Sequence, residues 1–358
     1  MNDKLYSMRV VLLFLIVLVF TASLNARAGE DYSLKGPHLV DVIQFKDLAR
    51  DSSQGRRLVP FKLHIPGKGG PYPVVVISHG AGGNWDTHFA QAQHLASHGF
   101  AVFCLEHVGS NTERMKRGIR IFHHLKQMIH SADEVLGRPK DVSFVLDQIT
   151  EWNKAHPSLK GRLDLGHVGV LGHSFGAFTA MVIAGMRPAL NWLEPKVGTG
   201  LGPDLFDKRV RCGVALSPQA PGDPFFINES YQTLRVPLLG VSGTKDRQQN
   251  GEPPVSRLES FKLWPSLKGN VFLWLNNAAH LDFTDTTGGD SHGISSPSRH
   301  NVQTVVRAAS LMFFNRCLKG SPSSLMELSN EHLERYLSGA INRIEIFKAN
   351  HQPALLNK

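Results

Sequence analysis

The hydrophobic pattern of the chain alternates between two periods. From residue 39 onward, short runs rich in β-branched and aromatic residues alternate with longer segments of helical periodicity. Most of the short runs are apolar at both alternating positions, as expected for strands that are covered on both faces. The predicted strands are 58–65, 73–78, 100–105, 168–171, 210–216, 236–241 and 271–275, and the predicted helices are 88–97, 141–155, 175–185 and 301–318. This alternation predicts an α/β fold with a mainly parallel central sheet and helices on both faces.

Two segments lie outside this simple alternation. Residues 111–140 mix Arg, Lys and His with Ile, Phe, Leu and Met, which favours an amphipathic helical insertion that could act as a lid. The histidines there have no metal-ligand spacing, so no metal site is predicted. Beyond Gly320, apolar residues at helical spacing predict a peripheral C-terminal helix over 324–338.

The first 28 residues differ from the rest of the chain. Lys4 and Arg9 precede the apolar run 10–20, and residues 26–28 (Ala-Arg-Ala) have the spacing of a cleavage site. Because the run is short for a bilayer crossing, a signal peptide over 1–28 is favoured over an uncleaved anchor. We therefore expect an exported protein, periplasmic or secreted, in which residues 29–358 form a single domain.

Composition and charge narrow the classes of partner. With 42% hydrophobic and 19% charged residues, the chain has the composition of a folded globular protein. Its formal net charge of +9 falls to +7 without residues 1–28, which hold three cations and one anion. The Lys and Arg residues are scattered and no nucleic-acid motif accompanies them, so nucleic acid is not an expected partner. Transient contact with an anionic membrane surface stays open.

The three cysteines, Cys104, Cys212 and Cys317, are too few and too dispersed for a disulfide scaffold. They also lack the paired spacing of a zinc site. Cys104 and Cys212 lie inside apolar strand-like runs, where a cysteine usually behaves as a small buried hydrophobe. One bridge remains open, and it would leave a third thiol unpaired.

Residues 172–176 read Gly-His-Ser-Phe-Gly, which fits the Gly-x-Ser-x-Gly pattern of a nucleophile elbow. In that motif a serine sits on a sharp turn between a strand and a helix. A strand-like run, 167–171, leads into the pentapeptide and a helical run, 177–183, follows it, as the motif requires. Ser174 is therefore the candidate nucleophile, near a helix N-terminus whose N–H groups favour negative charge. The alternative is a serine that only caps this helix.

A serine nucleophile needs a base to take its proton, and the base needs an acid to hold its tautomer. Behind a nucleophile elbow the chain order is serine, acid, histidine. Asp246 and His280 follow in that order, each just beyond a predicted strand, and they are the candidate acid and base. The alternatives are a surface-turn aspartate and a structural loop histidine. The reserve candidates are Glu252 for the acid and His292 and His300 for the base.

An oxyanion hole needs backbone N–H donors, typically one after the nucleophile and one from the loop after the third strand. Phe175 would supply the first donor. Residues 78–83 (Ser-His-Gly-Ala-Gly-Gly) follow a predicted strand, and Ala81 would supply the second. A glycine-rich loop can also cradle a phosphate. This one lacks the Gly-x-Gly-x-x-Gly spacing and the Lys-Ser/Thr ending, so no cofactor is predicted.

With these residues placed, residues 71–319 resemble the dienelactone-hydrolase-like and platelet-activating-factor-acetylhydrolase-like branch of the α/β-hydrolases. Besides the Asp246 and His280 segments, the resemblance rests on 75–80 (Val-Val-Ile-Ser-His-Gly), 95–100 (Leu-Ala-Ser-His-Gly-Phe), 109–111 (Gly-Ser-Asn), 138–142 (Arg-Pro-Lys-Asp-Val) and 172–176. It implies an α/β-hydrolase fold and a metal-independent serine esterase, with Ala81 and Phe175 at the positions of the family's oxyanion donors. Dienelactone hydrolases use a cysteine nucleophile, so Ser174 argues against a dienelactone substrate.

These features together predict hydrolysis of carboxylic esters, with short acyl chains favoured, by a triad of Ser174, His280 and Asp246 through an acyl-enzyme. The expected partner is a small-molecule or lipid ester, and neither a cofactor nor a metal is expected. Two alternatives stay open. One is a peptidase or polyester depolymerase that uses the same triad. The other is a catalytically inactive binding protein that keeps the scaffold.

Overall fold

The computed structural model describes residues 31–116, 121–248, 250–285, 298–321, 328–329, 333–337 and 341–349. The chain divides into two units, Met1–Tyr32 and Ser33–Lys358, and the elements below all lie in the second. A signal peptide over 1–28 ahead of a single domain stays a prediction, because residues 1–30 lie outside the described ranges. His292 and most of the predicted helix 324–338 also lie outside them.

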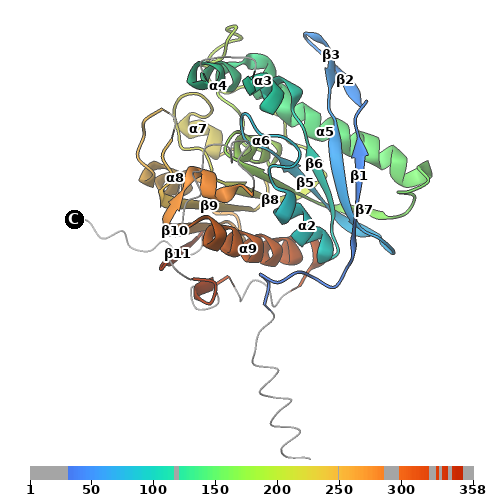
Figure 1. Ribbon diagram of the computed structural model, residues 1–358. Helices are drawn as coiled ribbons and strands as arrows, with labels where there is room; N and C mark the ends of the chain where they lie inside the picture. The colour runs from blue at the N-terminus through green and yellow to red at the C-terminus, as the bar shows by residue number, and fades with distance from the viewer. Residues whose placement is uncertain are drawn as a thin grey trace, which may run out of the picture. The chain divides into compact units, whose positions relative to one another are not determined.

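A large sheet forms the centre of the unit Ser33–Lys358 (Figure 1). In the described ranges nine strands follow the order β1-β4-β6-β5-β7-β8-β9-β10-β11. Neighbouring strands are parallel from β6 to β10, whereas β1, β4 and β11 pair antiparallel at the two ends. The bounds are β1 (Val40–Phe45), β4 (Phe61–Pro66), β5 (Tyr72–Ser78), β6 (Ala101–Leu105), β7 (Leu163–His173), β8 (Val210–Leu216), β9 (Leu238–Lys245), β10 (Val271–Ala279) and β11 (Ile344–Lys348). A separate hairpin joins β2 (Ala49–Ser52) to β3 (Gly55–Leu58).

Helices cover both faces of this sheet. Successive residues of a strand point to opposite faces. In β7, a Cβ on Gly169 would meet the Phe314 ring of α9 (Arg299–Lys319), whereas Val170 packs in the buried cluster that contains Val145 of α5 (Ala132–Ala155). The helices α9 and α5 therefore lie on opposite faces. The helix α2 (Phe89–Ser97) packs beside α9, and α6 (Phe175–Ile183) packs beside α5.

The predicted fold class is confirmed, since the sheet is mainly parallel and helices flank it. Strand 210–216 coincides with β8. The single strand predicted over 58–65 is wrong: β3 ends at Leu58 and β4 begins at Phe61. The intervening Pro60 has no N–H to donate to a sheet ladder. The edge strands β1 and β11 were not predicted, because short strands at a sheet edge have weak hydrophobic patterns.

The helix predicted to begin at Asp141 begins at Ala132. Pro139 favoured a helix boundary, because proline usually disrupts a helix interior. The structure instead keeps Pro139 inside α5 and caps the helix with Ser131, whose side chain accepts from the Glu134 N–H. The last nine residues of the predicted insertion 111–140 are therefore the start of α5 and not part of a lid.

The rest of the predicted insertion is helical, as expected. Its described residues form α3 (Thr112–Lys116) and α4 (Ile121–His130), and the 3-10 turn Val108–Ser110 precedes them. The remaining short elements are α7 (Asn228–Tyr231), α8 (Val255–Ser260) and the 3-10 turns Phe261–Leu263 and His280–Phe283. No helix in the described part of the chain is both long and apolar enough to cross a membrane.

Candidate active site

Ser174 occupies a sharp turn at the C-terminal edge of the sheet. The strand β7 ends at His173 and α6 begins at Phe175, so Ser174 alone joins the two. Its φ of 55° and ψ of −118° lie in a region that residues with a side chain rarely adopt. A Cβ on Gly172 would overlap the Gly176 carbonyl, and a Cβ on Gly176 would overlap the Ser78 carbonyl. Both glycines of the pentapeptide are therefore required by close backbone packing.

The structure brings Ser174, His280 and Asp246 together in series. His280 Nε2 lies 3.0 Å from Ser174 Oγ, and His280 Nδ1 lies 2.7 Å from Asp246 Oδ1. Asp246 follows β9 and His280 follows β10, and the parallel strands end at the same edge of the sheet as β7. With Nδ1–H donating to Asp246, Nε2 is free to accept the proton of the serine hydroxyl.

Asp246 is fully buried and strongly held as a carboxylate. Ser242 Oγ donates to its Oδ2 at 2.7 Å, and Arg257 Nε lies 3.4 Å from the same oxygen. Burial alone raises the pKa of Asp246, but the Arg257 charge and the His280 hydrogen bond outweigh it and hold that pKa well below its ordinary value. Asp246 therefore stays charged across the neutral range.

Sequence reasoning missed Arg257, which lies on α8. Its buried guanidinium donates to the Asp246 carbonyl at 3.0 Å and to the Ser217 and Pro218 carbonyls at 3.2 and 2.8 Å. It therefore ties the segment after β8 to the segment that holds the acid. No sequence signal distinguishes this arginine from a solvated one.

His173, the variable position before Ser174, also contributes to the site. Its buried ring donates from Nε2 to the His280 carbonyl at 2.9 Å. Burial, together with the nearby His280, holds the pKa of His173 well below its ordinary value. His173 is thus a neutral donor that fixes the backbone of the candidate base, a role that the motif alone does not indicate.

Ala81 and Phe175 line the same pocket as Ser174 and His280. Within the described residues, neither the Ala81 N–H nor the Phe175 N–H donates to a protein acceptor. Phe175 is the first residue of α6, where an N–H has no partner inside the helix. The loop passes close to the nucleophile, since a Cβ on Gly80 would lie 3.4 Å from the Ser174 Cβ. Among the described residues, both N–H groups are therefore without a protein acceptor beside the pocket that contains Ser174.

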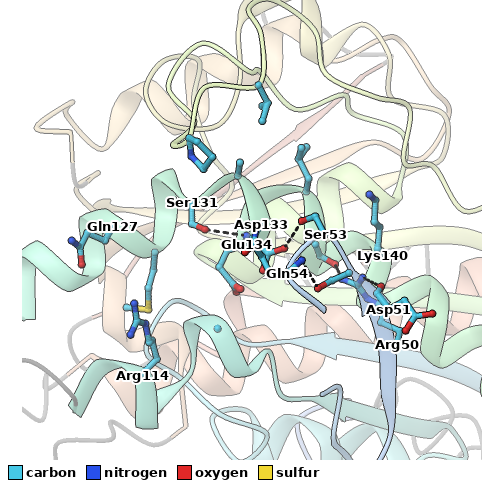
Figure 2. Close-up of a pocket in the computed structure, with 18 of the residues that line it drawn as sticks. Arg50, Asp51, Ser53, Gln54, Arg114, Gln127, Ser131, Asp133, Glu134 and Lys140 are labelled. Atoms are coloured by element: carbon cyan, nitrogen blue, oxygen red, sulfur yellow. Dashed lines mark hydrogen bonds between the residues drawn. The ribbon is translucent and has the colours of Figure 1, made fainter. Parts of the chain in front are cut away.

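A pocket of about 490 Å³ contains Ser174 and His280. Its lining includes the apolar residues Leu125 and Ile129 of α4 and Phe225. A larger pocket of about 1040 Å³ lies between the β2–β3 hairpin, α4 and α5, and none of the three triad candidates lines it (Figure 2). Of these two pockets, only the smaller is lined by Ser174 and His280.

The two reserve candidates in the described part of the chain are not part of this arrangement. Glu252 and His300 are exposed and outside the hydrogen-bonded series, and His292 lies outside the described residues. The three cysteines are free thiols, two of them buried. No cluster of His, Cys, Asp or Glu in the described ranges could hold a metal ion.

Comparison with known proteins agrees with this fold. A family model described as the alpha/beta hydrolase fold matches residues 73–237, which include the elbow at Ser174. The chain therefore has the α/β-hydrolase fold.

Three similar proteins indicate which branch of this fold the chain resembles. A platelet-activating factor acetylhydrolase of Cavia porcellus is 27% identical over 321 residues, covering 77% of this chain and 65% of that protein. The acetylhydrolase of Canis lupus familiaris is 30% identical over 252 residues, covering 62% and 50%. A cutinase of Thermobifida alba is 23% identical over 220 residues, covering 61% and 57%. The resemblance to the acetylhydrolase-like branch is confirmed, and the chain spans between half and two thirds of these relatives' lengths.

Proposed function

We propose that this protein hydrolyses carboxylic esters, with Ser174 as nucleophile, His280 as general base and acid, and Asp246 as the orienting carboxylate. The observation that supports this most is the series of two hydrogen bonds, 3.0 and 2.7 Å long, that joins the three side chains beside a pocket. Acetylhydrolases and a cutinase among the relatives support ester chemistry.

In the first step, Ser174 Oγ attacks the ester carbonyl carbon while His280 Nε2 takes the hydroxyl proton. The charge that develops on the carbonyl oxygen faces the N–H groups of Ala81 and Phe175. The Asp246 carboxylate stabilises the imidazolium. When the tetrahedral adduct collapses, His280 returns the proton to the departing alcohol and an acyl group stays on Ser174.

In the second step, water attacks the acyl-enzyme. His280 takes a proton from that water, and Ala81 and Phe175 again face the oxyanion. Collapse releases the carboxylic acid and restores the Ser174 hydroxyl. The buried, charged Asp246 supports both steps, since His280 becomes an imidazolium in each.

Ser174→Ala tests the assignment. The variant should fold and lose at least about 10⁴-fold in kcat on p-nitrophenyl butyrate, as triad serines do when removed. Glu252→Gln and His300→Gln are matched controls, because they change the exposed reserve residues, and both should keep wild-type turnover. Wild-type turnover by Ser174→Ala would refute the proposal. Absence of fluorophosphonate labelling at Ser174 in the wild type would favour an inactive binding protein.

For the acyl part of the substrate we propose a short chain. The relatives named acetylhydrolase favour this, and Leu125 and Ile129 offer apolar contacts to an acyl chain in the pocket of about 490 Å³. A profile over p-nitrophenyl esters from acetate to palmitate should therefore peak at the short end. The cutinase relative favours a polyester as the second candidate. Release of soluble acid from a polyester film, at a rate above that on short esters, would select it.

We also propose export through residues 1–28, on the sequence pattern described above. N-terminal sequencing of the protein made in a secreting host should begin at Gly29. Retention of residues 1–28 on the membrane-bound protein would instead indicate an anchor.

A further inference from the structure

A cluster of buried charged and polar side chains lies behind the loop that holds Ala81. We call it the buried charge cluster. Its members come from β3, β5, α5 and the segment 107–110, and none is more than 7% exposed: they are Arg57, Ser78, His107, Ser110, Glu134, Arg138 and Asp141. The segment 138–142, singled out in the sequence as part of the family resemblance, supplies two of them. The proposed mechanism uses none of these residues.

Part of the cluster has the form of a second triad. Ser78 Oγ lies 2.9 Å from His107 Nε2, and His107 Nδ1 lies 2.8 Å from Asp141 Oδ2. All three residues are 0% exposed, so no substrate reaches Ser78. This series is therefore structural, and its position directly under the loop of Ala81 points to support of that loop.

Arg138 holds the loop on both sides of Ala81. Its Nη2 donates to the His79 carbonyl, and its Nη1 donates to Ser110 Oγ at 3.1 Å. The Ser110 carbonyl in turn accepts from the Gly82 N–H at 2.8 Å. The guanidinium therefore fixes residue 79 directly and residue 82 through one intermediate.

The same guanidinium touches the other candidate donor. The Arg138 Cζ lies 4.3 Å from the centre of the Phe175 ring, within the range of a cation–π contact. Arg138 thus contacts the residue after the nucleophile and the loop of Ala81 at once. Its planar, forked geometry sets the spacing between these two segments.

Buried anions lie near Arg138, and Glu134 is joined to it through the Ser110 hydroxyl. Ser110 Oγ donates to Glu134 Oε2 at 2.6 Å, and Arg57 pairs with Glu134 at 2.6 Å and with Asp141 at 2.9 Å. Burial lowers the pKa of Arg138 to about 9, and the nearby charges of Glu134 and Asp141 act against that shift. Figure 2 shows the outer end of this arrangement, where Glu134 and its neighbour Asp133 form part of the wall of the larger pocket.

We propose that Arg138 is a positioning residue that sets the distance between the Ala81 and Phe175 N–H groups. This inference rests on the proposed esterase function. The two donors matter most when negative charge sits on the substrate oxygen, so their misplacement lowers kcat more than it changes KM.

The test compares Arg138→Lys and Arg138→Met with the wild type. Lys140→Ala is the matched control, because Lys140 is exposed on the same helix (Figure 2). The readouts are kcat and KM on p-nitrophenyl butyrate per fluorophosphonate-titrated site, and the Ki of a trifluoromethyl ketone that forms an oxyanion adduct with serine. Arg138→Met should lose about 10²-fold in kcat, comparable with the loss of one oxyanion donor. The Ki of the ketone should rise by a similar factor. Arg138→Lys should lose at least about tenfold, because one ammonium group cannot replace the fork.

Ser110→Ala covers the case in which neither Arg138 variant folds. It removes only the hydroxyl between Arg138 and Glu134 and should lower kcat about tenfold, with KM nearly unchanged. Wild-type kcat in a folded Arg138→Lys or Ser110→Ala protein overturns the inference, and so does a loss confined to KM or to the number of titrated sites. If the wild type turns over no ester, the proposed function fails and this inference falls with it. If the wild type turns over ester and the folded variants match its kcat, this inference alone fails.

Discussion

Acidification from pH 7 to pH 5 should destabilise this protein through its buried histidines. Burial, the largest cause in each case, lowers the pKa of His64 and His88 to about 4. It also holds the pKa values of His79, His107 and His173 well below the ordinary range. These side chains are therefore neutral in the folded protein at pH 5.

The sign of the effect follows from proton binding. In the unfolded chain a histidine has its ordinary pKa of about 6.5 and takes up a proton below that pH. In the folded protein His64 and His88 stay neutral down to about pH 4. The unfolded state then binds more protons, so the free energy of unfolding falls as the pH drops from about 6.5 to 4.

The magnitude follows from the pKa of about 4 that His64 and His88 have in the folded protein. Each pH unit between the folded and unfolded pKa of one group corresponds to about 1.4 kcal/mol. Between pH 7 and pH 5, His64 and His88 should each lower the free energy of unfolding by about 2 kcal/mol, and together by about 4 kcal/mol. His79, His107 and His173 act in the same direction. A domain of this kind has only about 5–15 kcal/mol in total, so the loss is large.

Two carboxyl groups act the opposite way. Burial raises the pKa values of Asp141 and Asp285, so their protonation in the folded state stabilises the protein as the pH falls. The contribution of one histidine is therefore best isolated by substitution. Comparison of His88→Gln with the wild type removes a single buried imidazole and leaves both aspartates in place.

Urea unfolding followed by tryptophan fluorescence at pH 7, 6 and 5 measures the effect. The wild type should lose several kcal/mol over this range, and His88→Gln should lose about 2 kcal/mol less. His300→Gln, an exposed histidine on α9, is the control and should follow the wild type. If the free energy of unfolding falls equally with pH in His88→Gln and in the wild type, the reasoning is refuted.

Three further predictions concern the site. Asp246→Asn should lower kcat about 10⁴-fold, whereas Glu252→Gln should not, as steady-state kinetics would show; equal losses would contradict the assignment. Arg257→Met should bring the pKa of Asp246 up toward its ordinary value, since the buried counter-charge is lost, and so reduce activity at pH 4–5 more than at pH 8. An unchanged pH–rate profile would argue against this. Gly176→Ala should destabilise the protein by at least about 1–3 kcal/mol, because its Cβ overlaps the Ser78 carbonyl, and an unchanged melting temperature would exclude that overlap.

The central strands and the candidate triad could be predicted from the sequence for the same reason. Each central strand is a local apolar run, and Ser174, Asp246 and His280 each follow the end of one. In a parallel sheet these ends share an edge, so chain order and strand ends together predict that the side chains meet. The spacing of the two glycines around Ser174 is equally local, since the turn itself requires them.

Features that depend on contacts between distant parts of the chain could not be predicted from the sequence. The strand β11 pairs with β10, about seventy residues earlier, and nothing in its five residues specifies that partner. The start of α5 was misplaced because Pro139 locally favours a boundary, whereas packing keeps the helix continuous through it. In each case tertiary contacts outweigh the local preference.

The buried arginines show this limit most clearly. In a sequence, Arg57, Arg138 and Arg257 look like the other arginines of a basic chain, and arginine is rarely buried. The buried guanidinium groups of Arg138 and Arg257 donate to carbonyls of the segments that follow β5, β8 and β9. The segments after β5 and β9 hold Ala81 and Asp246. The arginines therefore fix the backbone around the candidate site from outside it, and their roles can be recognised only after the strand ends have been placed in space.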